Sequence, residues 1–156
     1  MVKKALIKEI VEQVCVSLVL KEGKLDSSNR LALIILDNAV EVALKSYASY
    51  HSLLKDSKVT SQEAFSSILG IIKDQNKIVN SEEKDIQKYH KIRNELYQGA
   101  NLATVKDSVI DEYIVLAKIL LARLYDFRGS KLEWEKMTSD ARKSVIKDKM
   151  NLKELI

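Results

Sequence analysis

The sequence contains no proline, only four glycines and a single cysteine among its 156 residues. Proline and glycine are the residues that most often interrupt helices, so their scarcity favours long helices over a loop-rich fold. The single cysteine, Cys15, excludes an internal disulfide and gives no sign of an oxidising compartment. It lies on the apolar side of the first helical pattern, and we expect it to be a small core residue.

Several kinds of functional site are missing as well. One cysteine and two histidines, His51 and His90, do not form a zinc site at these positions, and the paired Glu-x-x-His motifs of di-iron bundles are absent. The sequence also lacks the glycine patterns that bind phosphates or dinucleotides and the strand–Ser–helix elbow of hydrolases. We therefore expect no metal ion and no cofactor.

Long hydrophobic runs are also absent, since no stretch reaches the ~18 apolar residues that a membrane span requires. The N-terminal segment is too charged for a signal peptide. Basic residues number 26 and acidic residues 22, for a net charge of +4. This small excess permits a polyanionic partner but does not demand one. We expect a cytoplasmic protein without a membrane partner.

Apolar residues recur with helical spacing along most of the chain and predict an all-α fold. We expect a single domain over residues 1–156, a bundle of four long helices with one or two shorter ones. Residues 28–127 form its expected core. The expected helices cover residues 3–20, 28–51, 61–72, 81–98 and 106–127, followed by a helical tail over 131–156 that packs on the bundle or on a second subunit.

Polar residues that cap helices predict where these helices begin. We expect caps at residues 26–28 and at Ser81, a capping box at 60–63, and a cap at 138–140 inside the tail. Residues 31–36 are apolar on all sides, so the helix that contains them is expected to lie at the centre of the bundle. His51, near the end of that helix, is expected to be exposed.

The helix expected over residues 81–98 carries the main chemical candidate. At about 100° per residue, one side of this helix gathers apolar, aromatic and polar groups around Arg93. A guanidinium is costly to bury unless it is paired or meets an anion. Arg93 therefore either packs on a carboxylate or lines a polar cleft or an interface. The residues on this side are Ile86, Tyr89, His90, Arg93, Leu96 and Tyr97.

The central helix offers two carboxylates that can neutralise Arg93. Asp37 or Glu41 is the candidate counter-charge, and Glu95, on the same helix as Arg93, is a third candidate. In the alternative interpretation Glu41 forms a surface ion pair with Lys45, which follows one helical turn later. The sequence leaves both arrangements open.

Residues 36–45 (LDNAVEVALK) and 90–99 (HKIRNELYQG) together resemble the HEPN superfamily, over about residues 28–127. The resemblance implies a small helical-bundle domain that forms a homodimer. Many HEPN proteins are metal-independent endoribonucleases of toxin–antitoxin and defence systems, with an active site shared across the dimer. An antitoxin or a nucleotidyltransferase is then a candidate partner.

In the HEPN motif an arginine and a following polar residue precede a histidine on the same helix. The resemblance assigns the first two positions to Arg93 and Asn94, whereas Gln98 stands where the histidine is expected. Cleavage of RNA by its 2′-hydroxyl needs a group that transfers protons near neutral pH, which imidazole does and a carboxamide does not. The implied function is binding of RNA or a nucleotide, with weak or lost ribonuclease activity.

Two further interpretations remain open. His90 lies one turn before Arg93 and supplies the missing imidazole if the protein is an active metal-independent endoribonuclease. Alternatively, the protein is a non-enzymatic interaction module in which the Arg93 side of the helix forms the dimer interface. The expected catalytic candidates are Arg93, Asn94, Gln98 and His90, and the expected binding residues are Arg93, Tyr97, Glu41 and Lys45.

Overall fold

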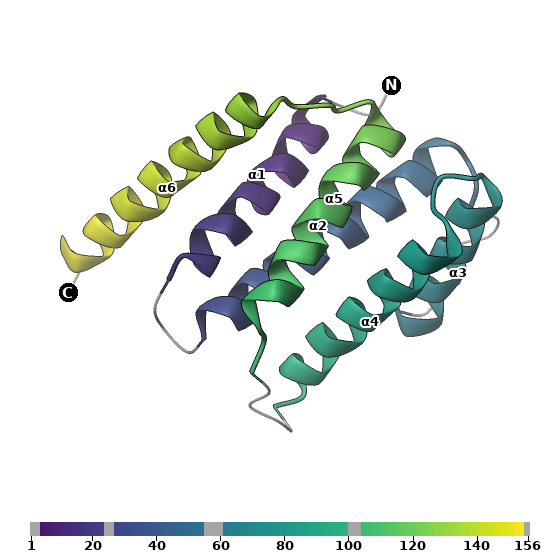
Figure 1. The fold of residues 1–156 in the computed structure, drawn as a ribbon, viewed down its shortest axis with the longest axis horizontal. Helices are drawn as coiled ribbons and strands as arrows, with labels where there is room; N and C mark the ends of the chain where they lie inside the picture. The colour runs from purple at the N-terminus through teal and green to yellow at the C-terminus, as the bar shows by residue number, and fades with distance from the viewer. Residues whose placement is uncertain (1–3, 24–26, 55–60, 100–103, 155–156) are drawn as a thin grey trace.

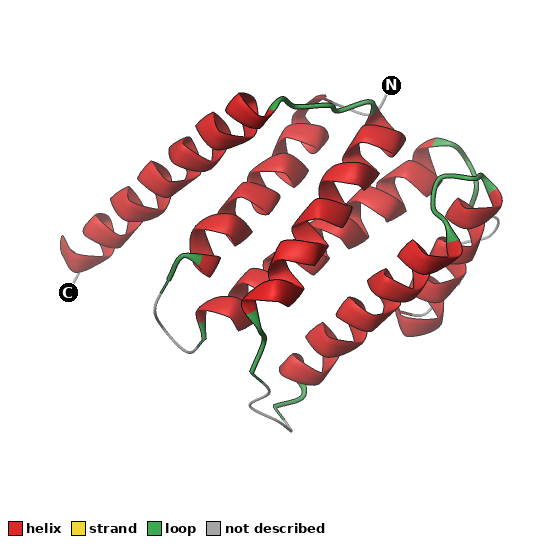
Figure 2. Cartoon of the chain, viewed as in Figure 1, coloured by secondary structure: helices red, strands yellow, loops and turns green. Residues whose placement is uncertain are grey.

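The computed structural model describes residues 4–23, 27–54, 61–99 and 104–154, without the side chains of 61–64 and 146–154. The residues described form helices and loops but no strand (Figure 2). The expected all-α bundle is therefore confirmed. Its helices are α1 (Lys4–Lys21), α2 (Ser28–Tyr50), α3 (Ser61–Asp74), α4 (Asn80–Tyr97), α5 (Asp107–Tyr125) and α6 (Lys131–Glu154).

Helix α2 lies at the centre and contacts α1, α3, α4 and α5, as its apolar N-terminal half predicts. Helix α6 packs along α1, on the side of the bundle away from α3 and α4 (Figure 1). The C-terminal tail thus packs on the bundle, which is one of the two arrangements that we expected from the sequence. None of the described helices combines the length and the apolar character that crossing a membrane requires.

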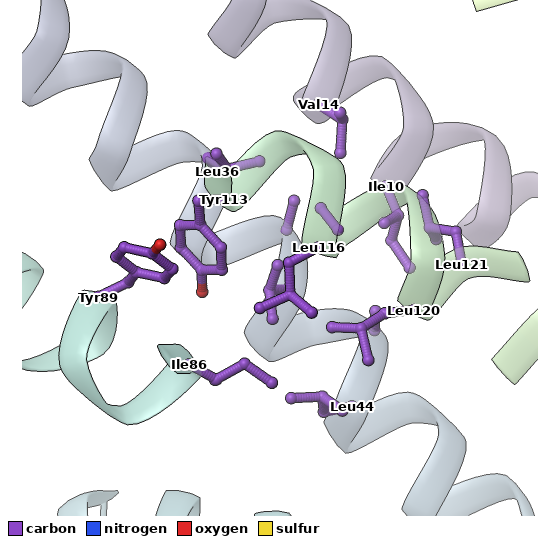
Figure 3. Packing of buried hydrophobic residues seen from close by; sticks show 14 of the residues in the cluster. Ile10, Val14, Leu36, Leu44, Ile86, Tyr89, Tyr113, Leu116, Leu120 and Leu121 are labelled. Carbon is purple, nitrogen blue, oxygen red and sulfur yellow. The ribbon is translucent and has the colours of Figure 1, made fainter. Parts of the chain in front are cut away.

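The core is built from the apolar stripes that the helical spacing predicts (Figure 3). Burying one large aliphatic side chain contributes roughly 1.5–3 kcal/mol, so these stripes determine which side of each helix faces inward. Cys15 is 1% exposed and is a core residue, as expected. The buried stripes include Phe65, Ile68, Leu69 and Ile72 of α3, and Tyr113, Leu116, Ala117, Leu120, Leu121 and Leu124 of α5.

Helix α4 begins slightly earlier in the sequence than predicted. Its N-cap is Val79 rather than Ser81. The carboxylate of Glu82 accepts a hydrogen bond from the backbone N–H of Val79 at 3.0 Å, so the glutamate satisfies the donor at this helix start. At α2, Ser27 makes no side-chain cap hydrogen bond. Residues 26 and 60 of the other predicted caps lie outside the described residues.

The predicted cap at residues 138–140 is also wrong, because these residues lie inside α6. The hydroxyl of Thr138 donates to the backbone oxygen of Trp134 within that helix. The helix begins instead with a capping box in which the hydroxyl of Ser130 accepts from the N–H of Glu133, whose carboxylate accepts from the N–H of Ser130. Helix α6 is therefore continuous over 24 residues, and five long helices with the shorter α3 replace the expected four.

Candidate functional site

Arg93 points from α4 toward α2, where two carboxylates one helical turn apart face it. Its Nη2 donates a hydrogen bond to Glu41 Oε2 at 2.8 Å, and its Nε lies 2.9 Å from Asp37 Oδ2. The Nε contact is an ion pair rather than a hydrogen bond, because the N–H is not directed at the oxygen. The prediction that Asp37 or Glu41 neutralises Arg93 is confirmed, and both carboxylates take part.

Glu41 also accepts a hydrogen bond from the Lys45 ammonium, so the two predicted pairings of Glu41 coexist. Burial alone raises the pKa of Glu41, but the hydrogen bond from Lys45 and the charges of Lys45 and Arg93 outweigh it and leave the pKa below its usual value. The charges of Asp37, Glu41, Arg93 and Lys45 sum to zero. In this arrangement the positive charge of Arg93 is already compensated and is not available to a phosphate.

Asp37 is the point at which three helices meet. Its side chain is 0% exposed, and it receives a hydrogen bond from the Tyr113 hydroxyl of α5 at 2.6 Å. Nδ1 of His90, on α4, lies 2.9 Å from its other oxygen. A buried carboxylate is costly without such partners. Burial and the charge of Asp37 raise the pKa of Tyr113 well above its ordinary value, so the hydroxyl remains protonated and donates.

Tyr113 is the residue of this cluster that the sequence did not single out, because it is one member of the apolar stripe of α5. Its ring is stacked on that of Tyr89, with centroids 4.3 Å apart (Figure 3). A tyrosine inside an apolar stripe needs a hydrogen-bond partner for its buried hydroxyl. This requirement is the feature of the sequence that could have identified Tyr113 as part of a polar cluster.

The ring of His90 is oriented by its neighbours. Nδ1 lies 2.9 Å from Asp37 Oδ2 and 3.0 Å from Arg93 Nη2. Only one of these two contacts can be a hydrogen bond, because a protonated Nδ1 donates to Asp37 whereas an unprotonated Nδ1 accepts from Arg93. A lone pair on Nδ1 would face the Asp37 carboxylate, and Arg93 Nη2 already donates to Glu41, so we assign the ring proton to Nδ1. The ring also stacks on Phe65 of α3, with centroids 4.0 Å apart. In this tautomer Nε2 carries the lone pair and can accept a proton.

A cleft of about 460 Å³ runs between α3 and α4, and His90 is part of its wall. Asn94 and Gln98 line it as well, each one helical turn further along α4. The structure therefore brings together three of the predicted catalytic candidates. The described residues that line it are Phe65, Ser66, Gln87, His90, Lys91, Asn94, Glu95 and Gln98.

The predicted binding residues occupy a different place. Arg93 of α4 forms ion pairs with Asp37 and Glu41 of α2, and Lys45 pairs with Glu41 within α2. Tyr97 is 64% exposed, and the Arg93 guanidinium lies 5.6 Å from the centre of its ring. The predicted site thus separates into a cleft with His90, Asn94 and Gln98, and an ion-pair cluster centred on Arg93.

Asp37, Glu41 and His90 also place one ligand atom each within 4.8 Å of one another, a grouping that can hold a metal ion. The guanidinium of Arg93 contacts all three residues. It therefore supplies the positive charge that the carboxylates require, and a metal ion would have to displace it.

No family model, no curated protein and no solved structure matches this chain. Segments 36–45 and 90–99 contact each other, because Asp37 and Glu41 belong to the first and His90 and Arg93 to the second. The chemistry of the site is accordingly inferred from its own side chains.

Proposed function

We propose that this protein is a HEPN-like homodimer that binds RNA or a nucleotide in the cleft between α3 and α4. The observation that carries the proposal is the His90 ring, which Asp37 holds through Nδ1 at the wall of a cleft that also contains Asn94 and Gln98. Carboxamides donate and accept hydrogen bonds, and a neutral imidazole accepts a proton. Together these groups suit the hydroxyls and base edges of a nucleotide.

In this proposal Arg93 is a positioning residue. Its ion pairs with Asp37 and Glu41 hold α4 against α2 and thereby set the place of His90, three residues earlier on α4. This assignment differs from the phosphate contact that the resemblance implies for Arg93. Lys91, which lines the cleft, is the cation that can reach a phosphate of the ligand.

A second candidate function, metal-independent endoribonuclease activity, is favoured by the Asp37–His90 contact. His90 Nε2 would accept the proton of a ribose 2′-hydroxyl while that oxygen attacks the adjacent phosphorus. The bond from phosphorus to the 5′-oxygen breaks, a 2′,3′-cyclic phosphate forms, and the 5′-oxygen takes a proton from water. Since Gln98 cannot act as the acid, we expect this activity to be weak.

The homodimer is supported by Tyr97, an exposed aromatic side chain at the end of α4. Aromatic residues with a polar tip are enriched at protein interfaces. Sedimentation of the intact protein and of Tyr97→Ser tests this part of the proposal. We expect a dimer for the intact protein and a shift toward monomer for the variant, and a monomeric intact protein would contradict it.

The test of function measures binding and cleavage of single-stranded RNA in the presence of a metal chelator. The proteins are the intact chain, Gln98→His, His90→Gln and the double variant, with His51→Gln as a control for the loss of an exposed histidine. We expect RNA binding by the intact chain, faster cleavage by Gln98→His, and loss of that cleavage in the double variant. If these proteins are folded and none binds RNA or a nucleotide, the proposal is wrong and an interaction module becomes the better interpretation.

A further inference from the structure

The cleft between α3 and α4 is rich in carboxamides. Gln87 and Asn94 of α4 line it, together with Gln98, the residue that caps the C-terminal end of α4. Their spacing of seven and four residues places them along one side of the helix. A carboxamide presents a donor and an acceptor side by side, which is the pattern that a nucleobase edge also presents.

Among the residues that the structure describes around the cleft, the charged side chains balance. Lys91 and Glu95 both line it, one helical turn apart, and contribute one charge of each sign. The nearby Arg93 is neutralised by Asp37 and Glu41. Binding through phosphates depends on an excess of positive charge and on the release of counterions. A cleft with balanced charge is therefore poorly suited to recognise a ligand through its phosphate group.

The aromatic part of the wall adds a second feature. His90 lies in the cleft wall with its ring stacked on Phe65, whose side chain is 2% exposed. Because Phe65 covers one face of the His90 ring and the His90 side chain is 12% exposed, this part of the wall is an apolar surface that a base edge can meet rather than an open surface on which a base stacks. The cleft volume of about 460 Å³ lies within the range of small-ligand pockets and accommodates a nucleobase.

We infer that the cleft binds an unpaired nucleobase by its hydrogen-bonding edge, with adenine the best match, and that phosphate contributes little to the affinity. This inference rests on the proposed function and specifies its ligand. Adenine is favoured because asparagine and glutamine form paired hydrogen bonds with its N6 and N7 atoms. The base is unpaired because the base edges of a duplex RNA are inaccessible in its deep, narrow groove.

The experiment measures binding of adenosine, ribose 5-phosphate, oligoadenylate and an abasic oligonucleotide of the same length by calorimetry, at low and moderate salt. We expect adenosine and oligoadenylate to bind with little dependence on salt, and ribose 5-phosphate and the abasic chain not to bind. Asn94→Leu and, separately, Gln98→Leu should each weaken binding of adenosine about tenfold or more. Asn94 is half-buried, so its replacement could disturb the packing of α4. Gln98 is exposed at the end of α4, so its replacement leaves the core intact and provides an independent test.

One matched control and one test variant separate the base from the phosphate. Asn38→Leu changes an exposed asparagine of α2 that bonds Gln13, and it should leave adenosine binding unchanged. Lys91→Gln tests the phosphate contact that the proposed function assigns to Lys91, and its effect on oligoadenylate binding should be smaller than that of Asn94→Leu, because the base supplies most of the affinity. If the abasic chain binds as well as oligoadenylate, with steep salt dependence that Lys91→Gln removes, the base inference is overturned while RNA binding stands. If no nucleic acid or nucleotide binds, the inference and the proposed function both fail.

Discussion

The guanidinium of Arg93 lies 2.9 Å from the carboxylate of Asp37, a side chain that is 0% exposed in the middle of the bundle. This contact joins α4 to α2 and places a positive charge beside a negative one that water does not reach. Asp37 in turn contacts His90, so the same carboxylate that holds Arg93 also orients the imidazole at the cleft. The stability of the bundle and the chemistry of its candidate site therefore depend on one buried group.

Replacing Arg93 by methionine should lower the free energy of unfolding by about 3 kcal/mol, because it removes the positive charge beside the buried Asp37, while Glu41 keeps its pair with Lys45. Urea denaturation followed by circular dichroism measures the change. Lys8→Met is the control, since Lys8 pairs with Glu12 on the surface, where their side chains are 78% and 62% exposed. Its effect should be within the error of the measurement. Similar losses for the two variants would show that the Arg93 pairs are no more important than a surface pair.

Replacing Tyr113 by phenylalanine should cost about 2 kcal/mol, because a hydroxyl that donates to a buried carboxylate is lost. Tyr125→Phe provides the comparison, since the Tyr125 hydroxyl donates to the neutral backbone oxygen of Ala43. We expect about 1 kcal/mol for that variant. Thermal unfolding of both variants is the measurement. A smaller loss for Tyr113→Phe than for Tyr125→Phe would contradict a strong hydrogen bond between the Tyr113 hydroxyl and the Asp37 carboxylate.

Acid should weaken the bundle through Glu41. Its pKa in the folded protein is below 4.5, the ordinary value, because hydrogen bonding by Lys45 and the neighbouring positive charges outweigh the opposing effect of burial. A carboxyl with a lowered folded pKa stabilises the protein above its unfolded pKa, and this contribution disappears as the pH falls through the folded pKa.

The measurement is the free energy of unfolding of the intact protein and of Glu41→Gln as the pH is lowered from neutrality. The intact protein should be the more stable of the two near neutral pH. The difference between them should shrink as the pH falls through and below 4.5. A difference that stays constant over this range would contradict the lowered pKa.

Cys15 should react slowly with thiol reagents in the folded protein. Its side chain is 1% exposed, and burial raises the pKa of its thiol, so little thiolate is present and reagents have no direct access. The rate of reaction with a chromogenic disulfide, with and without denaturant, measures the effect. We expect a strong acceleration on unfolding, and equal rates in both conditions would place Cys15 at the surface.

Much of the architecture was predictable from the spacing of apolar residues. The stripes of α3 and α5 repeat with the helical period, and the side chains that they predict to be buried, such as Ile72 and Leu120, are buried. The carboxylates opposite Arg93 were also predictable as candidates, because a buried guanidinium requires a counter-charge and Asp37 and Glu41 interrupt an apolar helix.

The helix starts at α4 and α6 were predicted less well. Ser81 and Thr138 are good cap residues in isolation, yet Glu82 and the Ser130–Glu133 pair satisfy the donors instead. Several polar residues near a helix start compete for the same backbone groups, and small differences in local geometry decide among them.

The sequence by itself determined the inward sides of α3 and α5 and the need of Arg93 for a carboxylate, because the first follows from local spacing and the second from the cost of burying charge. Only the tertiary structure decided that both Asp37 and Glu41 meet that need, that Tyr113 completes the cluster, and that Phe65 of α3 joins His90 at a cleft. The reason is physical: helical periodicity describes one element, whereas the rotation and crossing of packed helices determine which side chains from different elements meet.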